Sequence, residues 1–108
     1  MREIINGKRY DTEKATLIGE YNNLGRGCDS VTDFKFCEEG LYVTRSGNYF
    51  LAGEGGAMSK YAGPAGQNAS QGGSGITPIS KDEAYEWAER HLEPAELEKH
   101  FYDTIVDA

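Results

Sequence analysis

The sequence contains no long apolar run. Hydrophobic residues make up 38% of its 108 residues, but no stretch approaches the roughly 20 consecutive apolar residues that span a bilayer. Residues 1–10 also lack the continuous apolar segment of a signal peptide. We therefore expect a cytoplasmic protein with no membrane partner, folded as a single domain over residues 1–108.

Basic side chains are scarce. The chain has 11 Lys and Arg against 18 Asp and Glu, a formal net charge of −7. Binding to nucleic acid or to an anionic membrane through the general surface requires clustered Lys and Arg. This composition argues against direct nucleic-acid binding unless a local basic patch forms.

Motifs for metal binding and catalysis are also missing. Cys28 and Cys37 form no C-x-x-C pair, and their spacing to the two histidines matches no zinc-finger pattern. Glu38 and Glu39 follow Cys37 directly and would raise the pKa of its thiol rather than activate it. Residues 53–60 lack the Gly-Lys-Ser/Thr of a phosphate loop. We expect no metal, no cofactor and no enzyme activity; a thiol nucleophile at either cysteine is the enzyme alternative.

Turn residues between extended runs predict two β-hairpins. Asn6-Gly7 is typical of a tight type I′ turn. A two-residue loop sets the expected pairs, Ile5 with Lys8 and Glu3 with Tyr10. Alternating apolar residues over 32–52, with a turn at Ser46-Gly47, predict a second and longer hairpin. Residues 16–21 favour a strand over a helix because Gly19 lies in the middle.

Glycine is concentrated in one span. Residues 53–75 hold 8 of the 14 glycines, and we expect a long loop there, either functional or mobile. Residues 76–79 then predict a short strand. Residues 1–52 would thus form a hairpin-rich sheet, and residues 76–108 a strand followed by helices.

The clearest helix signal begins at Ser80. Ser80 and Glu83 match a capping box, in which each side chain bonds the other residue's backbone N–H. A stripe at helical spacing should pack on the sheet; its members are Ala84, Tyr85, Ala88 and Leu92. Pro94 suits the first turn of a second helix. The predicted fold is α+β: a small antiparallel sheet built from two β-hairpins, with a C-terminal helical hairpin packed on one face.

The negative charge lies mostly in the helical segment. Residues 1–80 hold 9 acidic and 8 basic side chains, whereas residues 81–108 hold 9 acidic and 3 basic. Spacings of 4, 3 and 4 place four carboxylates on one helix face: Asp82, Glu86, Glu89 and Glu93. Glu96 and Glu98 continue the acidic character. A solvated surface is the simple interpretation, and a docking site for a basic partner is the functional one.

Four segments that cover most of residues 4–93 form a specific combination: IINGKRYDTE at 4–13, LYVT at 41–44, GNYFLAGEGGAMSKY at 47–61, and ITPIS at 76–80 with Glu83, Ala84 and Trp87. Together they resemble a family of small, largely uncharacterised bacterial proteins found on prophages and other mobile elements. The family pattern usually has Thr where Lys14 stands, and often a Trp in the region of residues 69–71. The segment after Glu93 resembles an extension present in some members.

The resemblance implies a cytoplasmic protein of mobile-element origin, and small acidic proteins of that origin often inhibit host defence, anti-CRISPR proteins included. Our hypothesis is a non-catalytic, protein-binding inhibitor whose carboxylates occupy a basic, nucleic-acid-binding surface of a host complex such as a Cas subunit. Tyr49 and Tyr61 would serve as aromatic anchors. An exposed sheet face would also suit a homodimer. The open alternative is a nucleic-acid-binding regulator that uses the basic residues of the first hairpin, and its cations are Lys8, Arg9 and Lys14, with Arg26, Lys35 and Arg45 elsewhere.

Overall fold

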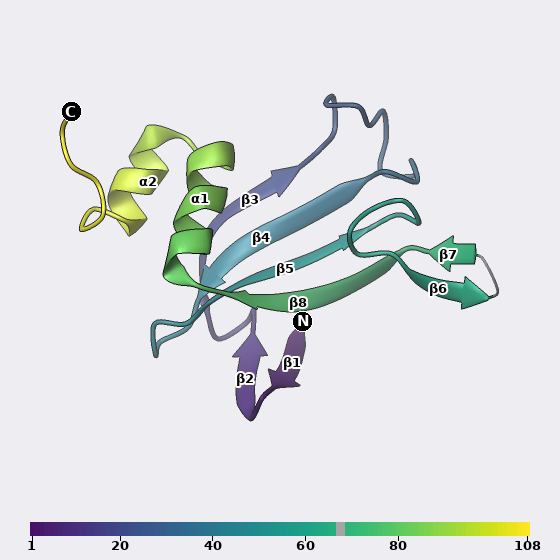
Figure 1. Ribbon diagram of the computed structural model, residues 1–108, viewed down its shortest axis with the longest axis horizontal. Coiled ribbons are helices and arrows are strands. Elements are labelled where there is room, and N and C mark those ends of the chain that lie inside the picture. Colours follow the sequence, from purple (N-terminus) through teal and green to yellow (C-terminus); the bar gives the residue numbers. More distant parts are fainter. Residues whose placement is uncertain (67–68) are drawn as a thin grey trace.

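A four-stranded antiparallel sheet forms the centre of the molecule (Figure 1). The structure is a computed structural model and describes residues 1–66 and 69–108. The strand order is β3–β4–β5–β8. The strands are β3 (Thr16–Asn22), β4 (Cys37–Val43), β5 (Tyr49–Gly55) and β8 (Gly73–Ile79). With two helices on this sheet and small hairpins beside it, the fold class is α+β.

Two helices, α1 (Lys81–His91) and α2 (Pro94–His100), pack on one face of the sheet. The predicted capping box is confirmed: Ser80 Oγ accepts the Glu83 N–H at 3.1 Å, and the Glu83 carboxylate accepts the Ser80 N–H at 3.0 Å. Pro94 opens α2 as expected. The core under the helices comprises Ile18, Leu41, Leu51, Ala84, Trp87, Ala88 and Phe101. Trp87, which the predicted stripe omitted, is therefore a central core residue of α1.

The first hairpin consists of β1 (Arg2–Ile5) and β2 (Lys8–Asp11) and has the predicted register. Asn6 and Gly7 both have positive φ, 53° and 80°, as a type I′ turn requires. The prediction that both hairpins build one sheet is wrong. This hairpin is a separate two-stranded sheet, and it packs on the face opposite the helices.

The reason lies in the apolar run of β5. Leu51 points to the helices, while Phe50 and Ala52 point to the other face, because side chains alternate along a strand. Both faces of β5 therefore need a cover. Tyr10 of the hairpin supplies it, with its ring 5.4 Å from the ring of Phe50, edge to face.

The second hairpin is confirmed as β4 and β5, joined by a turn at residues 44–48. Its predicted start at residue 32 is wrong, because residues 32–36 form turns and the first strand begins at Cys37. The expected loop over 53–75 is largely wrong. Strand β5 continues to Gly55, and β6 (Gly63–Gly66) pairs with β7 (Ala69–Gln71) in a small hairpin that projects from the sheet (Figure 1). Residues 67 and 68, also part of that expectation, lie outside the described residues.

Close approach explains two of these glycines. A Cβ on Gly53 would lie 2.5 Å from the Tyr61 ring, and a Cβ on Gly73 would lie 2.4 Å from the Tyr61 carbonyl oxygen. Such positions accept only glycine unless the neighbours move. The glycines thus mark tight packing of residues 56–62 against the sheet.

Candidate functional site

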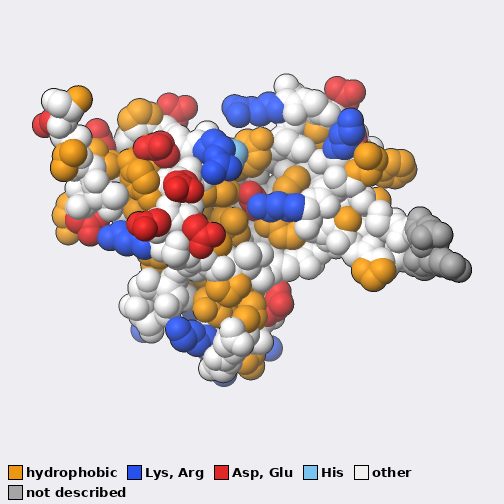
Figure 2. Space-filling model, viewed as in Figure 1, with side chains coloured by type: hydrophobic (Ala, Val, Ile, Leu, Met, Phe, Trp, Pro, Cys, Tyr) orange, Lys and Arg blue, Asp and Glu red, His pale blue; other side chains and the backbone are white. Residues whose placement is uncertain are grey.

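The first candidate surface is the outer side of α1. Asp82, Glu86 and Glu89 are exposed, whereas Trp87 and Ala88 on the inner side are buried. Figure 2 shows acidic side chains gathered over this helix. The core contacts of α1 fix the position of these three carboxylates relative to the sheet.

The acidic side chains continue past the end of α1. The helix ends at His91, so the prediction of four carboxylates on one helix is wrong for Glu93, which is the exposed N-cap residue of α2. Glu96 and Glu98 are exposed residues of α2. We call these residues together the acidic face: Asp82, Glu86, Glu89, Glu93, Glu96 and Glu98.

The carboxylates of the acidic face have no Lys or Arg partner within ion-pair distance among the described residues. The ion pairs there join Lys60 to Glu39 and Lys81 to Asp103, and Glu96 Oε2 lies 3.9 Å from His100 Nε2. Arg90 borders a shallow surface depression beside Glu86 and Glu89, beyond 4 Å of either carboxylate. The acidic face is therefore available to cations from outside.

The two predicted aromatic anchors already have partners within the molecule. Tyr49 is half-buried and stacks on Phe101, with ring centroids 5.8 Å apart. Tyr61 is half-buried, and its hydroxyl donates to Glu39 Oε2 at 2.6 Å. Neither ring stands out from the acidic face as a free anchor.

Glu39 is a buried carboxylate that the sequence analysis treated only as a neighbour of Cys37. It is 5% exposed and accepts from Tyr61, from Trp87 Nε1 at 2.8 Å and from Lys60 Nζ at 2.6 Å. Its position follows from alternation along β4, because Leu41 faces the helices and Glu39 shares that side. It links the helix, the sheet and the glycine-rich segment.

The hydrogen bonds determine the protonation state of Glu39. Burial alone would raise its pKa, but the bonds from Lys60, Tyr61 and Trp87 outweigh burial and hold the pKa below the ordinary value of 4.5. Burial and then the Glu39 carboxylate raise the pKa of the Tyr61 hydroxyl. Glu39 is thus a charged structural node at neutral pH.

His91 is the last residue of α1, and its side chain packs against β3. Its ring stacks on Tyr21 at 3.8 Å and meets Trp87 edge to face at 5.0 Å. Burial, and then the nearby Arg90, lower its pKa. Its Nδ1 is buried without a hydrogen-bond partner among the described residues. These contacts make His91 a packing residue of the helix–sheet interface.

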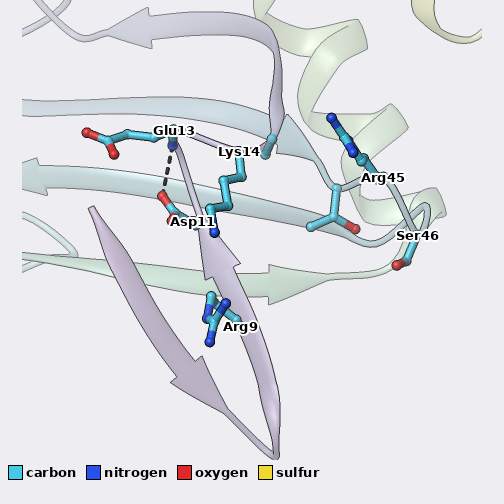
Figure 3. A pocket seen from close by; sticks show the side chains of 8 residues that line it. Arg9, Asp11, Glu13, Lys14, Arg45 and Ser46 are labelled. Atoms are coloured by element: carbon cyan, nitrogen blue, oxygen red, sulfur yellow. Dashed lines mark hydrogen bonds between the residues drawn. The ribbon is translucent and has the colours of Figure 1, made fainter.

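The second candidate surface is a pocket between the first hairpin and the β4–β5 turn (Figure 3). Arg9 comes from β2, Lys14 from the turn that follows, and Arg45 from the β4–β5 turn. The other lining residues are Asp11, Glu13, Ala15, Thr44 and Ser46. We call this the cationic pocket. Sequence spacing could not identify it, because Arg9 and Arg45 are 36 residues apart and line one pocket only through the packing of the hairpin on the sheet.

The cysteines occupy structural positions. Cys28 is fully buried, and its thiol donates to the Ser30 carbonyl at 3.3 Å. Burial, and then Glu39, raise the pKa of the Cys37 thiol, in the direction the sequence predicted. Within residues 1–66 and 69–108, no three Cys, His, Asp or Glu side chains are placed to hold a metal ion.

Two exposed surfaces of opposite charge are therefore the candidate sites, the acidic face and the cationic pocket. In the described part of the chain, neither helix has the length and apolar composition needed to cross a membrane. Comparison of the chain with protein families, with curated proteins and with solved structures finds no match.

Proposed function

We propose that the protein is a non-catalytic binding protein whose acidic face docks on a basic protein surface, and that it blocks nucleic acid from that surface. The observation that carries this proposal is the state of Asp82, Glu86 and Glu89. They are exposed, lie beyond ion-pair distance of any described Lys or Arg, and are fixed on a helix whose other side is core.

Electrostatics explains why such a face would compete with nucleic acid. Like charges four residues apart on a helix repel and cost a few tenths of a kcal/mol per pair. A partner rich in Lys and Arg removes this repulsion and is steered to the face as it approaches. A surface that binds phosphates offers the required cations. A Cas effector complex from the host is the partner class that the family resemblance favours.

The test is displacement of labelled nucleic acid from purified host effector complexes. The double variant Glu86→Lys with Glu89→Lys changes the net charge by four units on the acidic face. The matched control, Glu20→Lys with Glu54→Lys, makes the same change at two exposed residues that border a depression with Tyr42 and Ala52 on the hairpin side. We expect the wild type and the control to displace the nucleic acid and the acidic-face variant to fail.

Two results would contradict the proposal. Equal loss in both double variants would mean that only net charge matters, and the acidic face would not be a site. If the wild-type protein displaces nothing from the complexes, the inhibitor function is wrong. Thermal midpoints within a few degrees of wild type would show that the variants remain folded.

The nucleic-acid-binding regulator remains the alternative prediction. Its cations Lys8, Arg26 and Lys35 do not line the cationic pocket, and Arg26 lies over the Tyr21 ring at 5.7 Å instead. Three cations around one pocket, with two carboxylates among them, suit a single anionic group better than the extended phosphate backbone of a nucleic acid. We therefore do not extend the proposed function to nucleic acid.

A further inference from the structure

The cationic pocket brings together three cationic side chains. Arg9, Lys14 and Arg45 are exposed, and none of the ion pairs among the described residues includes any of them. The three come from separate segments that the hairpin packing brings to one pocket. In the view of Figure 3 the Lys14 amine points toward Arg9, whereas Arg45 lies on the other side of the pocket with its guanidinium turned away from them. Unpaired cations that line one pocket indicate an anionic ligand.

Hydroxyl groups add donors to the same pocket. Thr44 Oγ1 accepts the Asn48 N–H at 3.1 Å, which leaves its own proton free to donate to a ligand. Ser46, on the same turn, is exposed. An oxyanion with several oxygens would use both the cations and these hydroxyls.

The two carboxylates among the described residues that line the pocket reduce its net positive charge but form no ion pair with its cations. Asp11 is 8% exposed, and its Oδ1 accepts the Glu13 N–H at 2.9 Å, so it serves the turn. The Glu13 side chain extends away from the three cations (Figure 3). The lining side chains carry three positive and two negative charges.

We propose that the cationic pocket binds a phosphoryl dianion, as in inorganic phosphate or a terminal phosphate ester. None of the described residues that line the pocket is aromatic, so a nucleobase would find no ring there to stack on. A terminal phosphate carries about −1.5 to −2 charges near pH 7, more than one phosphodiester, and three oxygens that accept hydrogen bonds. The site is separate from the acidic face.

The test follows the backbone amide NMR signals of residues 9, 14 and 44–46 during titration with sodium phosphate, with sodium chloride at matched ionic strength as the reference. We expect saturable shifts with phosphate only. Arg45→Gln should weaken binding at least about tenfold, the loss of one charge-assisted hydrogen bond. Lys8→Gln is the matched control, because Lys8 and Arg9 point to opposite sides of β2, and it should change the affinity less than twofold.

A variant that should bind phosphate more tightly complements the variant that should bind it more weakly. Asp11→Asn keeps an oxygen for the Glu13 N–H and removes a negative charge, so phosphate should bind more tightly. Equal shifts with chloride, or equal affinity in Arg45→Gln and Lys8→Gln, would overturn the proposal. The result is independent of the acidic face, because Glu86→Lys with Glu89→Lys should leave phosphate binding intact.

A second titration distinguishes the sources of the phosphoryl group. It uses a short single-stranded oligonucleotide with either a 5′-phosphate or a 5′-hydroxyl. Shifts with the 5′-phosphate alone would support a chain terminus as the ligand, and shifts with inorganic phosphate alone would support a small free ligand. Equal shifts with both oligonucleotides would show contact with phosphodiesters and would overturn the terminal-phosphate proposal.

Discussion

The two layers that cover the sheet differ in anchoring and in charge. The helical layer contributes Ala84, Ala88 and Phe101, all 0% exposed, and carries most of the negative charge. Among the described residues of the hairpin layer, Tyr10 alone is buried in the apolar core, at 6% exposed, and Ile4 remains 69% exposed. Residues 1–15 hold four basic and three acidic side chains. A deeply packed layer thus presents anions, and a lightly packed layer presents cations.

This difference predicts that the two proposed ligands act on different layers: the basic protein on the helical layer, and the phosphoryl group on the hairpin layer. The α1 part of the acidic face is held by three buried core residues of that helix, so its charges are positioned before a partner arrives, which lowers the ordering cost of binding. The cationic pocket lies at the junction of the hairpin and the sheet. A ligand there would hold the two together and stabilise the hairpin's contact with the sheet.

The largest expected effect is on the helical layer. Phe101 lies between Tyr49 and Tyr85, with ring centroids 5.8 and 5.5 Å away. Phe101→Ala should lower the free energy of unfolding by about 3–5 kcal/mol, the cost of a large cavity. Ile5→Ala, at a half-buried hairpin position, should cost about 1 kcal/mol. Urea denaturation measures both, and equal losses would contradict the difference in anchoring.

Next in size is the contact of the glycine-rich segment with the sheet. Gly53→Ala places a Cβ 2.5 Å from the Tyr61 ring and 2.6 Å from the Glu38 carbonyl oxygen. We expect a loss of about 2 kcal/mol, as for overpacking. Gly63→Ala is the control, because no atom lies within 4 Å of its Cβ. If thermal unfolding shows equal losses, residues 56–62 do not need glycine for packing.

Acid should weaken the same contact through Glu39. The pKa of Glu39 is lower in the folded chain than its ordinary value of 4.5, so its charge stabilises the fold above that pH. This contribution disappears as the pH falls below about 4.5 toward the lowered pKa. Glu39→Gln should cost about 1.5 kcal/mol at pH 7.

The variant should also have a flatter stability profile between pH 5 and pH 3. Urea denaturation across this range measures the profile for both proteins. Because the pKa of His91 is lowered as well, some stability should already be lost below about pH 6.5 in both. A parallel acid decline in the wild type and in Glu39→Gln would show that Glu39 does not control it.

Local signals predicted the local structure well. The Asn6-Gly7 turn and the Ser80 capping box depend on neighbouring residues only, and both are confirmed. The separate hairpin layer was missed, although Phe50, Leu51 and Ala52 form an apolar run that needs cover on both faces. Such a run distinguishes a buried central strand from one with a solvated face.

Non-local contacts explain what sequence reasoning did not find. The glycines of residues 53–75 resemble a flexible loop in composition, but Gly53 and Gly73 are explained by the close approach of Tyr61, which the sequence does not encode locally. The cationic pocket likewise depends on the hairpin packing that places Arg9 and Arg45 in the lining of one pocket. The acidic face could be predicted because helical spacing places Glu86 and Glu89 together.

The smallest expected effect tests the hairpin's attachment. Glu3 of β1 accepts the N–H of Ile76, in β8 at the edge of the sheet, at 2.7 Å through Oε2. Pro78, further along that edge, has no N–H to donate. Glu3→Ala should remove about 1 kcal/mol of stability and should speed hydrogen exchange at the Ile76 amide. Exchange at Leu51, within the central strand β5, should not change beyond the global loss, whereas a uniform increase at both amides would mean that the hairpin and the sheet unfold as one unit.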